Sequence, residues 1–424
     1  MLLKLAWRNI WRNTRRTILT IAGVAFGLGI CIYSRALGVG FHNQMIRDAI
    51  HVFAGHIQVN ALHWHGNWTM EYLMDNPDAV FNAIKDDPRI IGAAPRATVP
   101  GLISRKLIKA ATGQESMNDD ESGEENTSTA LITGVDPEAE KKITSLPTKM
   151  RKGRYISADD PMGVAIGADL AKTLGVDIGD RVLLWTQNYY ESLEAKYFFV
   201  RGIYKSGSFD LDTFYVFVPL QTVQQFLQLD RMVTTVTIVL KDSEYLDPVT
   251  NSIKGNLDPK VYEVLKWTDF KPEIWQYVVF DDIGGYMFLG ILMIVVVFGI
   301  LNTQLMAVFE RTREFGAMLA LGTRPSRVAL LVFIECAMMT AVGVVFGNLL
   351  GLLAAYINSR APIDLSRDAA AYEVFGIDPR LYAAVLPFPF VICTCLIFSI
   401  ALVMSLWPAF RAARYKPVDA LRHV

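Results

Sequence analysis

The polar middle of the chain contains no cysteine. The 424 residues include four cysteines, and all of them lie in strongly apolar stretches: Cys31, Cys336, Cys393 and Cys395. A disulfide framework is therefore excluded for the long polar segment between the first two apolar stretches. Cys393 and Cys395 are spaced C-x-C within one apolar run, and we interpret them as packing residues.

The short motifs of common catalysts are also missing. The Gly-Lys pair never occurs, so the chain has no phosphate loop of the G-x-x-x-x-G-K-[ST] type. G-x-S-x-G, H-E-x-x-H and C-x-x-C are absent as well. The formal net charge of −1 gives no reason to expect a nucleic-acid partner. We therefore expect no catalytic residue, no metal site and no cofactor bound directly by this chain.

The chain is instead rich in apolar residues, at 52% of the sequence. Four stretches reach the roughly 20 apolar residues that a membrane-spanning helix needs, namely residues 17–41, 284–309, 328–358 and 387–407. The first resembles a signal peptide, but no small-x-small cleavage site follows it, so we interpret it as a retained anchor. The predicted fold class is an integral-membrane α-helical protein with four transmembrane helices and a large α+β extracytoplasmic domain between helices 1 and 2.

Lysine and arginine mark one side of this membrane protein. They concentrate in residues 1–16, 310–327 and 408–424, and basic segments near span ends stay in the cytoplasm. Both termini are therefore predicted to be cytoplasmic, with residues 42–283 and the short loop 359–386 on the outer side. Residues 1–16 also alternate apolar and basic positions at helical spacing, which favours an amphipathic elbow helix in the headgroup plane over a simple basic anchor.

The long outer segment, residues 42–283, has the mixed pattern of an α+β domain. Alternating, strand-like runs occur at residues 56–59, 181–184, 196–200, 215–218 and 234–240, with helical patterns at 168–174 and 220–229. Its ends, at residues 34–53 and 271–283, could continue the neighbouring spans as stalk helices. Residues 114–128 are acidic and lack apolar periodicity, which predicts a mobile loop, or alternatively a docking loop for a basic partner.

Five of the six histidines crowd the start of this domain. They are His42, His51, His56, His63 and His65. On a strand, His63 and His65 would share one face, an arrangement that can suit Zn or Cu. No cysteine or fixed ligand spacing supports such a site, so an ordinary surface is the preferred interpretation.

Few polar residues interrupt the spans. Arg35 lies near the outer end of the first span, where its side chain can snorkel to the interface. Asn302 and Gln304 lie in the second span, and Glu335 lies about two turns into the third. Intramembrane charges are usually functional. For Glu335 we expect a structural hydrogen bond to neighbouring helices or to basic groups at the inner face; proton or substrate handling is the alternative.

Several motifs carry a family resemblance. Glu310–Gly322 reads E-R-T-R-E-F-G-A-M-L-A-L-G, which resembles the E-R-x-x-E-[apolar]-G-x-x-x-A-x-G signature of the FtsX/MacB/LolC-LolE class of ABC transporter permeases. The tail Pro408–Arg422 and the start Ala6–Asn13 are similar to the ends of the same class. Thr133–Pro137 and Leu170–Val176 resemble its periplasmic core domain. The resemblance covers nearly the whole chain in the family's order.

The resemblance implies that residues 310–327 form a coupling helix seated in a groove of a separate cytoplasmic ABC ATPase; a basic loop that only fixes topology is the alternative. The implied ATPase-coupling residues are Glu310, Arg311, Glu314, Phe315, Gly316, Ala317, Leu319, Ala320 and Gly322. ATP with Mg would bind to that partner ATPase, in two copies. A second permease subunit, identical or different, is also implied, in a bacterial inner membrane whose lipids surround the spans.

Three functions remain open within the class, and the sequence does not name the substrate. A LolC/LolE-like permease would release lipoproteins, with Leu37, Tyr286, Met287 and Leu289 as candidate substrate-cavity residues; ordinary lipid or dimer packing explains these four residues equally well. A MacB-like permease would export peptides or drugs through a periplasmic adaptor. An FtsX-like protein would signal to a cell-wall hydrolase. A periplasmic lipoprotein chaperone or adaptor is a further possible partner, and a four-span anchor for an enzyme or receptor is the alternative outside the class.

Overall fold

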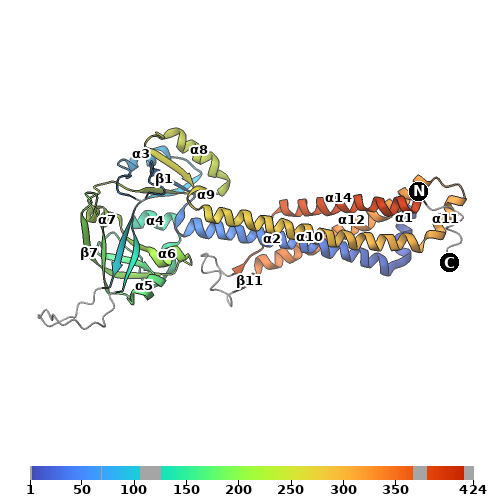
Figure 1. Ribbon diagram of the computed structural model, residues 1–424, viewed down its shortest axis with the longest axis horizontal. Coiled ribbons are helices and arrows are strands. Elements are labelled where there is room, and N and C mark those ends of the chain that lie inside the picture. Colours follow the sequence, from blue (N-terminus) through green and yellow to red (C-terminus); the bar gives the residue numbers. More distant parts are fainter. Residues whose placement is uncertain (1, 68, 106–125, 366–379, 415–424) are drawn as a thin grey trace. The chain divides into compact units, whose positions relative to one another are not determined.

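The computed structural model describes residues 2–67, 69–105, 126–365 and 380–414 (Figure 1). It divides into two compact units. The helical unit takes its described residues from 2–43, 277–365 and 380–414, and the domain unit takes its described residues from 44–276.

The helical unit is built from long helices. Its elements are α1 (Leu2–Ile10), a 3-10 turn (Trp11–Asn13), α2 (Thr14–Ala49), α10 (Pro272–Glu310), α11 (Thr312–Ala320), α12 (Pro325–Arg360) and α14 (Pro387–Ala413). Among the described residues, four helices are long and apolar enough to cross a membrane, as the sequence predicts: Leu3–Ala54, Pro272–Glu310, Pro325–Arg360 and Phe390–Ala413. A two-stranded sheet of β11 (Ile363–Asp364) and β12 (Arg380–Leu381) completes this unit.

Two helices extend well past the apolar stretches that predict them. Helix α2 continues to Ala49, and a π-helical turn, η2 (Ile50–Ala54), follows it. Helix α10 begins at Pro272. Proline suits the first position of a helix, because the N–H that it lacks would have no partner within the helix there.

Helix α1 and the 3-10 turn after it cover residues 2–13 of the predicted elbow, residues 1–16, and α2 already begins at Thr14. Ala6 and Ile10 are buried, whereas Leu3, Trp7 and Trp11 are exposed. The buried side packs on α12. The exposed apolar rings give the elbow a surface suited to the membrane interface.

Helices α2 and α12 approach closely along a row of glycines on α12. A Cβ on Gly347 would lie 2.8 Å from Leu28 Cβ, and a Cβ on Gly351 would lie 2.8 Å from Ile32 Cβ. Gly343 meets Val24 in the same way. Because both sets of residues repeat every four positions, the glycines form a groove into which the apolar ridge of α2 fits.

The domain unit is a ten-stranded mixed sheet with helices packed on it. Its strands are β1 (Ile57–Ala61), β2 (Ile90–Ser104), β3 (Thr127–Val135), β4 (Met150–Gly153), β5 (Gly163–Gly167), β6 (Arg181–Gln187), β7 (Leu193–Tyr204), β8 (Tyr215–Pro219), β9 (Thr235–Leu240) and β10 (Tyr262–Lys266). The order is β10-β1-β9-β2-β3-β8-β5-β7-β4, and β6 pairs with β2 and β7. The β3–β8 and β5–β7 pairs are parallel, and the others are antiparallel.

The helices of this unit cover two main cores. They are α3 (Pro77–Ala83), α4 (Pro137–Ile143), α5 (Ala168–Leu174), α6 (Phe209–Phe214), α7 (Leu220–Leu227), α8 (Leu246–Asn256) and α9 (Trp267–Phe270). One core lies between α5, α7 and the strands around β2, β3 and β5–β7. The other lies between α3, α8 and the strands β1, β9 and β10.

The five strand patterns and both helical patterns of the domain are confirmed, as β1, β6, β7, β8, β9, α5 and α7. Helix α7 ends at Leu227, two residues before the predicted end, because Gln228 takes a left-handed conformation with φ 58°. Residues 114–125 of the predicted acidic loop lie outside the described residues, and Thr127 and Ser128 already belong to β3.

The placement of His63 and His65 on a strand is wrong. Strand β1 ends at Ala61, and both histidines lie in the turns that follow it. His63 has φ 67°, which is incompatible with an extended strand. The two rings therefore do not share a strand face. His56, by contrast, is buried, with 3% of its surface exposed.

Candidate functional site

The coupling segment, residues 310–327, contains the short helix α11 between the last residue of α10, Glu310, and the start of α12 at Pro325. Helix α10 stops at Glu310 because Arg311 leaves the helical conformation, and α11 begins at Thr312. At the other end, Gly322 has φ 86°. The N–H of Gly322 bonds to the carbonyl of Leu319, and that of Thr323 bonds to the carbonyl of Met318. Gly322 is therefore the left-handed glycine that ends α11.

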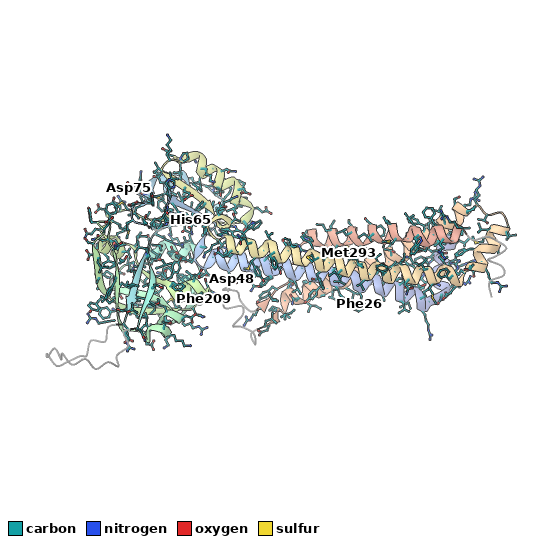
Figure 2. All side chains as sticks on the ribbon, in the orientation of Figure 1. Phe26, Asp48, His65, Asp75, Phe209 and Met293 are labelled. Atoms are coloured by element: carbon teal, nitrogen blue, oxygen red, sulfur yellow. The ribbon has the colours of Figure 1, made fainter. Side chains whose placement is uncertain are left out.

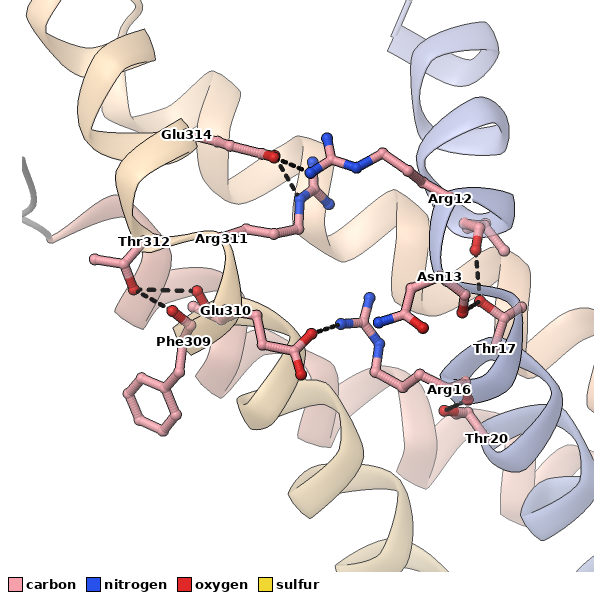
Figure 3. A network of polar contacts seen from close by, with 12 residues as sticks. Arg12, Asn13, Arg16, Thr17, Thr20, Phe309, Glu310, Arg311, Thr312 and Glu314 are labelled. Carbon is pink, nitrogen blue, oxygen red and sulfur yellow. Dashed lines mark hydrogen bonds and ion pairs between the residues drawn. The ribbon is translucent and has the colours of Figure 1, made fainter. Parts of the chain in front are cut away.

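Two arginines of the elbow and early α2 pair with the glutamates of this segment (Figure 3). Arg12 forms an ion pair with Glu314, and Arg16 Nη1 lies 2.7 Å from Glu310 Oε2. Partial burial raises the pKa of Glu314, but hydrogen bonds from Arg12 and Arg311 outweigh it, so the pKa is lowered below its ordinary value. The glutamates of the E-R-x-x-E motif thus have partners within the chain.

The arginine of the motif links the coupling segment to α12. Arg311 Nε donates to Glu314 Oε2 at 2.8 Å, and Arg311 Nη1 donates to Glu335 Oε2, also at 2.8 Å. The other carboxylate oxygen of Glu335 accepts a hydrogen bond from Asn9 Nδ2 at 2.7 Å. Glu335 is 8% exposed, and these two bonds connect it to α1 and to a basic side chain of the coupling segment. We call Asn9, Arg311 and Glu335 the polar hub.

A small cavity of about 20 Å³ lies against the polar hub. Gln304 of α10 lines it and is 2% exposed, yet neither of its amide atoms has a hydrogen-bond partner among the described residues. This volume holds about one water molecule, which such an amide would bind. Asn302, the other polar residue predicted in this span, is exposed instead.

The burial of α11 divides the predicted ATPase-coupling residues into two groups. Phe315 and Gly316 are both buried. Phe315, at 1% exposed, packs on the bundle in a cluster with Val308, Val332 and Ala412. Ala317 and Leu319 are half-buried, and Ala320 and Gly322 are exposed. Leu321, which the predicted set omits, is 88% exposed. Helical spacing explains the division, because residues 312, 315, 316 and 319 share one face.

The four candidate substrate-cavity residues do not share one environment. Leu37 and Leu289 pack against separate apolar clusters of the bundle. Tyr286 and Met287 are exposed, at 58% and 66%. Tyr286 and Met287 both belong to α10, so the exposed part of the predicted cavity comes from one helix.

Arg35 has two partners on α10, Asp282 and Tyr286, and Asp282 lies outside the predicted span 284–309. Its guanidinium lies 3.2 Å from Asp282 Oδ1 and stacks over the Tyr286 ring, 4.7 Å from the centroid. His42 Nε2 lies 2.7 Å from Asp281 Oδ2. The sequence places Asp281 and Asp282 just before the apolar stretch, so no periodicity connects them with α2.

Comparisons with known proteins agree with this architecture. Residues 17–256 match the family model of the MacB-like periplasmic core domain. Residues 286–417 match the FtsX-like permease C-terminal model. The first match alone covers more than half of the chain.

Curated relatives align over nearly all of the chain. The lipoprotein-releasing system transmembrane protein LolC of Xylella fastidiosa (strain 9a5c) is 25% identical over 95% of this chain and 93% of its own length. The macrolide export ATP-binding/permease protein MacB of Brucella melitensis biotype 1 is 26% identical over 99% of this chain and 60% of its own length. The crystal structure of the periplasmic region of MacB from Actinobacillus actinomycetemcomitans is 14% identical, with a TM-score of 0.35, over 54% of this chain and 95% of that chain.

The family-model matches determine the family. The helices suited to a membrane and the homologues indicate a membrane protein with a periplasmic domain. Family membership implies an ABC ATPase partner and a permease dimer. The chain belongs to the ABC transporter permeases of the FtsX/MacB/LolC class.

Proposed function

We propose that this chain is a permease subunit of the bacterial inner membrane that transmits the motion of a separate cytoplasmic ABC ATPase to its periplasmic domain. Its work would be to extract lipoproteins or other amphipathic substrates from the membrane. Both termini and the coupling segment would be cytoplasmic. Two ATPase copies, each with Mg-ATP, and a second permease subunit would complete the complex.

The polar hub is the observation that carries this proposal. It joins α1 through Asn9, the coupling segment through Arg311, and α12 through Glu335. The Arg16–Glu310 pair adds α2 and the end of α10. A displacement of α11 would therefore move several helices together rather than bend one loop, as a motion transmitter requires.

The exposed end of α11 supplies the surface for the ATPase. Ala320, the last residue of α11, and Leu321, directly after it, are exposed there, and Leu321 is an apolar side chain at 88% exposure. Arg313, near the start of α11, is also exposed. A few side chains that fill well-packed, desolvated pockets of the partner contribute most of the binding energy of an interface. The glutamates and Arg311 hold the helix in position from within the chain, whereas these residues would enter the groove.

The experiment places a charge on this surface. Leu321→Asp should abolish co-purification of the ATPase that accompanies the wild-type chain from native membranes, because the carboxylate would be buried without a partner. Leu321→Met, a matched apolar substitution, should retain the ATPase. Undiminished ATPase recovery with Leu321→Asp, or a wild-type chain that never carries an ATPase, contradicts the proposal.

Lipoprotein release is preferred over export because the LolC relative is matched over 93% of its length, whereas the MacB relative is matched over 60%. The MacB match still covers 99% of this chain, which keeps MacB-like export with a periplasmic adaptor as the second candidate.

Mass spectrometry of the complex trapped without ATP hydrolysis distinguishes the candidate functions. An acylated lipoprotein supports release, while an adaptor supports export. A cell-wall hydrolase instead would indicate FtsX-like signalling.

A further inference from the structure

A cavity of about 240 Å³ lies in the domain unit where the chain enters and leaves the sheet. We call it the joint cavity. Its lining comes from three segments: residues 48–58 around η2, residues 206–215 around α6, and residues 270–274 at the start of α10. Figure 2 labels two of the lining residues, Asp48 and Phe209. The volume lies slightly below the roughly 300 Å³ of the smallest drug-sized sites, which suits a small ligand or one end of a larger one.

Aromatic rings form much of the wall. Phe53, Phe209, Tyr215 and Phe270 all line the cavity. The Phe53 and Tyr215 rings are 5.5 Å apart in an edge-to-face arrangement. Phe209 is 50% exposed, a large apolar side chain left accessible beside the cavity. A ligand with an apolar body would therefore find aromatic contacts on more than one side.

The charged residues of the lining are unbalanced. Three carboxylates, Asp48, Asp210 and Glu273, accompany one ammonium group, that of Lys271. Lys271 Nζ lies 3.5 Å from Asp210 Oδ2 and 3.2 Å from Glu273 Oε1. One cation thus serves two carboxylates, and the lining as a whole has an excess of negative charge. The imbalance favours a positively charged ligand.

We propose that the joint cavity binds an amphipathic cation, an ammonium group carried on an apolar body. Ammonium groups bind to carboxylates and to the faces of aromatic rings, and the cavity offers both. The neighbouring wall already holds a cation in this way, because the Arg96 guanidinium stacks 3.7 Å from the centroid of the Phe53 ring. A neutral or anionic ligand of the same size would lack the contacts to Asp210 and Glu273.

The position of the cavity gives the ligand a mechanical effect. Its lining includes Val52 and Phe53 of η2, Ile274 of α10 and Leu211 of α6, all within the domain unit. A bound ligand would contact these three segments at once. It would therefore hold η2 and the start of α10 against α6 within the domain unit. Binding itself does not depend on the transport function proposed above.

Binding can be measured on the full-length chain in phosphatidylcholine nanodiscs. The probe is benzyltrimethylammonium, followed by saturation-transfer NMR, with benzyl alcohol as the neutral comparator and empty nanodiscs as the blank. We expect saturable binding of the cation and at most weak binding of the alcohol. Asp210→Asn and Phe209→Ala should each weaken binding by about fivefold. Ile274→Trp, which fills the cavity without changing its charge, should also weaken it.

The matched control is Glu244→Gln, an exposed carboxylate of the same domain outside the cavity. It should bind the probe as the wild type does. Three outcomes overturn the proposal: cation binding no greater than in empty nanodiscs, equal affinity for benzyl alcohol, or binding that Asp210→Asn and Ile274→Trp leave unchanged.

Discussion

Asn9 Nδ2 donates a 2.7 Å hydrogen bond to Glu335 Oε1, although 326 positions separate the two residues. The second oxygen of the same carboxylate accepts from Arg311 at 2.8 Å. One buried carboxylate thus holds both the elbow helix and the coupling segment on α12. The position of the coupling segment therefore depends on a group deep in the bundle as well as on its own surface.

Replacement of this carboxylate should loosen the cytoplasmic end of the bundle. Glu335→Ala leaves the guanidinium of Arg311 largely buried with one fewer anionic partner, and we expect a loss of about 3 kcal/mol in the free energy of unfolding. Arg12→Ala serves as the contrast, because Arg12 is 64% exposed in its pair with Glu314, and exposed pairs contribute at most about 1 kcal/mol. Thermal unfolding in nanodiscs measures both. Equal losses for the two variants would show that the polar hub is not the stabilising element.

Close packing of α2 on α12 makes a second prediction. A Cβ on Gly347 would lie 2.8 Å from Leu28 Cβ and 3.0 Å from the carbonyl oxygen of Ala25. Gly347→Ala should therefore push the helices apart and lower the free energy of unfolding by about 1–3 kcal/mol. In contrast, a Cβ on Gly290 of α10 would meet nothing within 4 Å, so Gly290→Ala should be neutral or slightly stabilising.

Thermal unfolding of the two alanine variants in the same nanodiscs compares them directly. The substitution is chemically identical at both sites, so the difference reports the space available rather than helix propensity. If the Gly347→Ala variant unfolds at the wild-type temperature, α2 and α12 are not in close contact at Gly347.

The spans were predictable because their signal is local. Apolar stretches of 20 or more residues give helices wherever they occur, and the alternating runs of β6–β9 likewise carry their own pattern. Strand β2 escaped prediction because Pro95, Pro100 and Gly101 interrupt it. Those residues usually break strands, yet β2 pairs with β3, β6 and β9 along its length.

The site was predictable only in part. The motif identifies the coupling segment, but a motif does not say which face of a nine-residue helix meets the chain's own bundle. Phe315 and Gly316 are on that face, and their burial required α12 and α14 to be in place. Asn9 had no sequence signal at all, because its partner is 326 positions away.

A buried ion pair in the domain unit makes a third prediction. Arg96 Nε lies 2.6 Å from Glu140 Oε1, and the two side chains are 3% and 0% exposed. Glu140→Ala would leave the guanidinium buried without a counter-charge, which destabilises the domain by about 3–5 kcal/mol. Glu138→Ala, two positions away on α4, removes a side chain that is 74% exposed and should cost less than about 1 kcal/mol.

Hydrogen exchange of the β2 amides in the full-length chain measures the opening of this domain. The Glu140 variant should exchange faster at these amides, and the Glu138 variant should match the wild type. Comparable exchange in both variants would mean that the Arg96–Glu140 pair does not hold the sheet.

The buried His56 predicts acid sensitivity of the domain unit. Burial and the nearby His51 lower the pKa of His56 to about 4, although Asp242 opposes the shift. Its Nδ1 accepts a hydrogen bond from the Leu240 N–H at 3.2 Å, which requires that nitrogen to be unprotonated. In the unfolded chain the pKa is about 6.5, so between pH 6.5 and 4 the unfolded state binds more protons than the folded state.

The stability that neutral His56 contributes is therefore complete above pH 6.5 and decreases as the pH falls toward 4, by up to about 3 kcal/mol. Exchange of the Leu240 amide at pH 7.5 and 5, corrected for the intrinsic rate, measures this change. His56→Asn keeps a side-chain acceptor but cannot titrate, and should remove most of the difference between the two pH values. His65→Gln removes an exposed histidine and should leave the difference intact. A pH dependence that survives in His56→Asn would assign the acid sensitivity to another group.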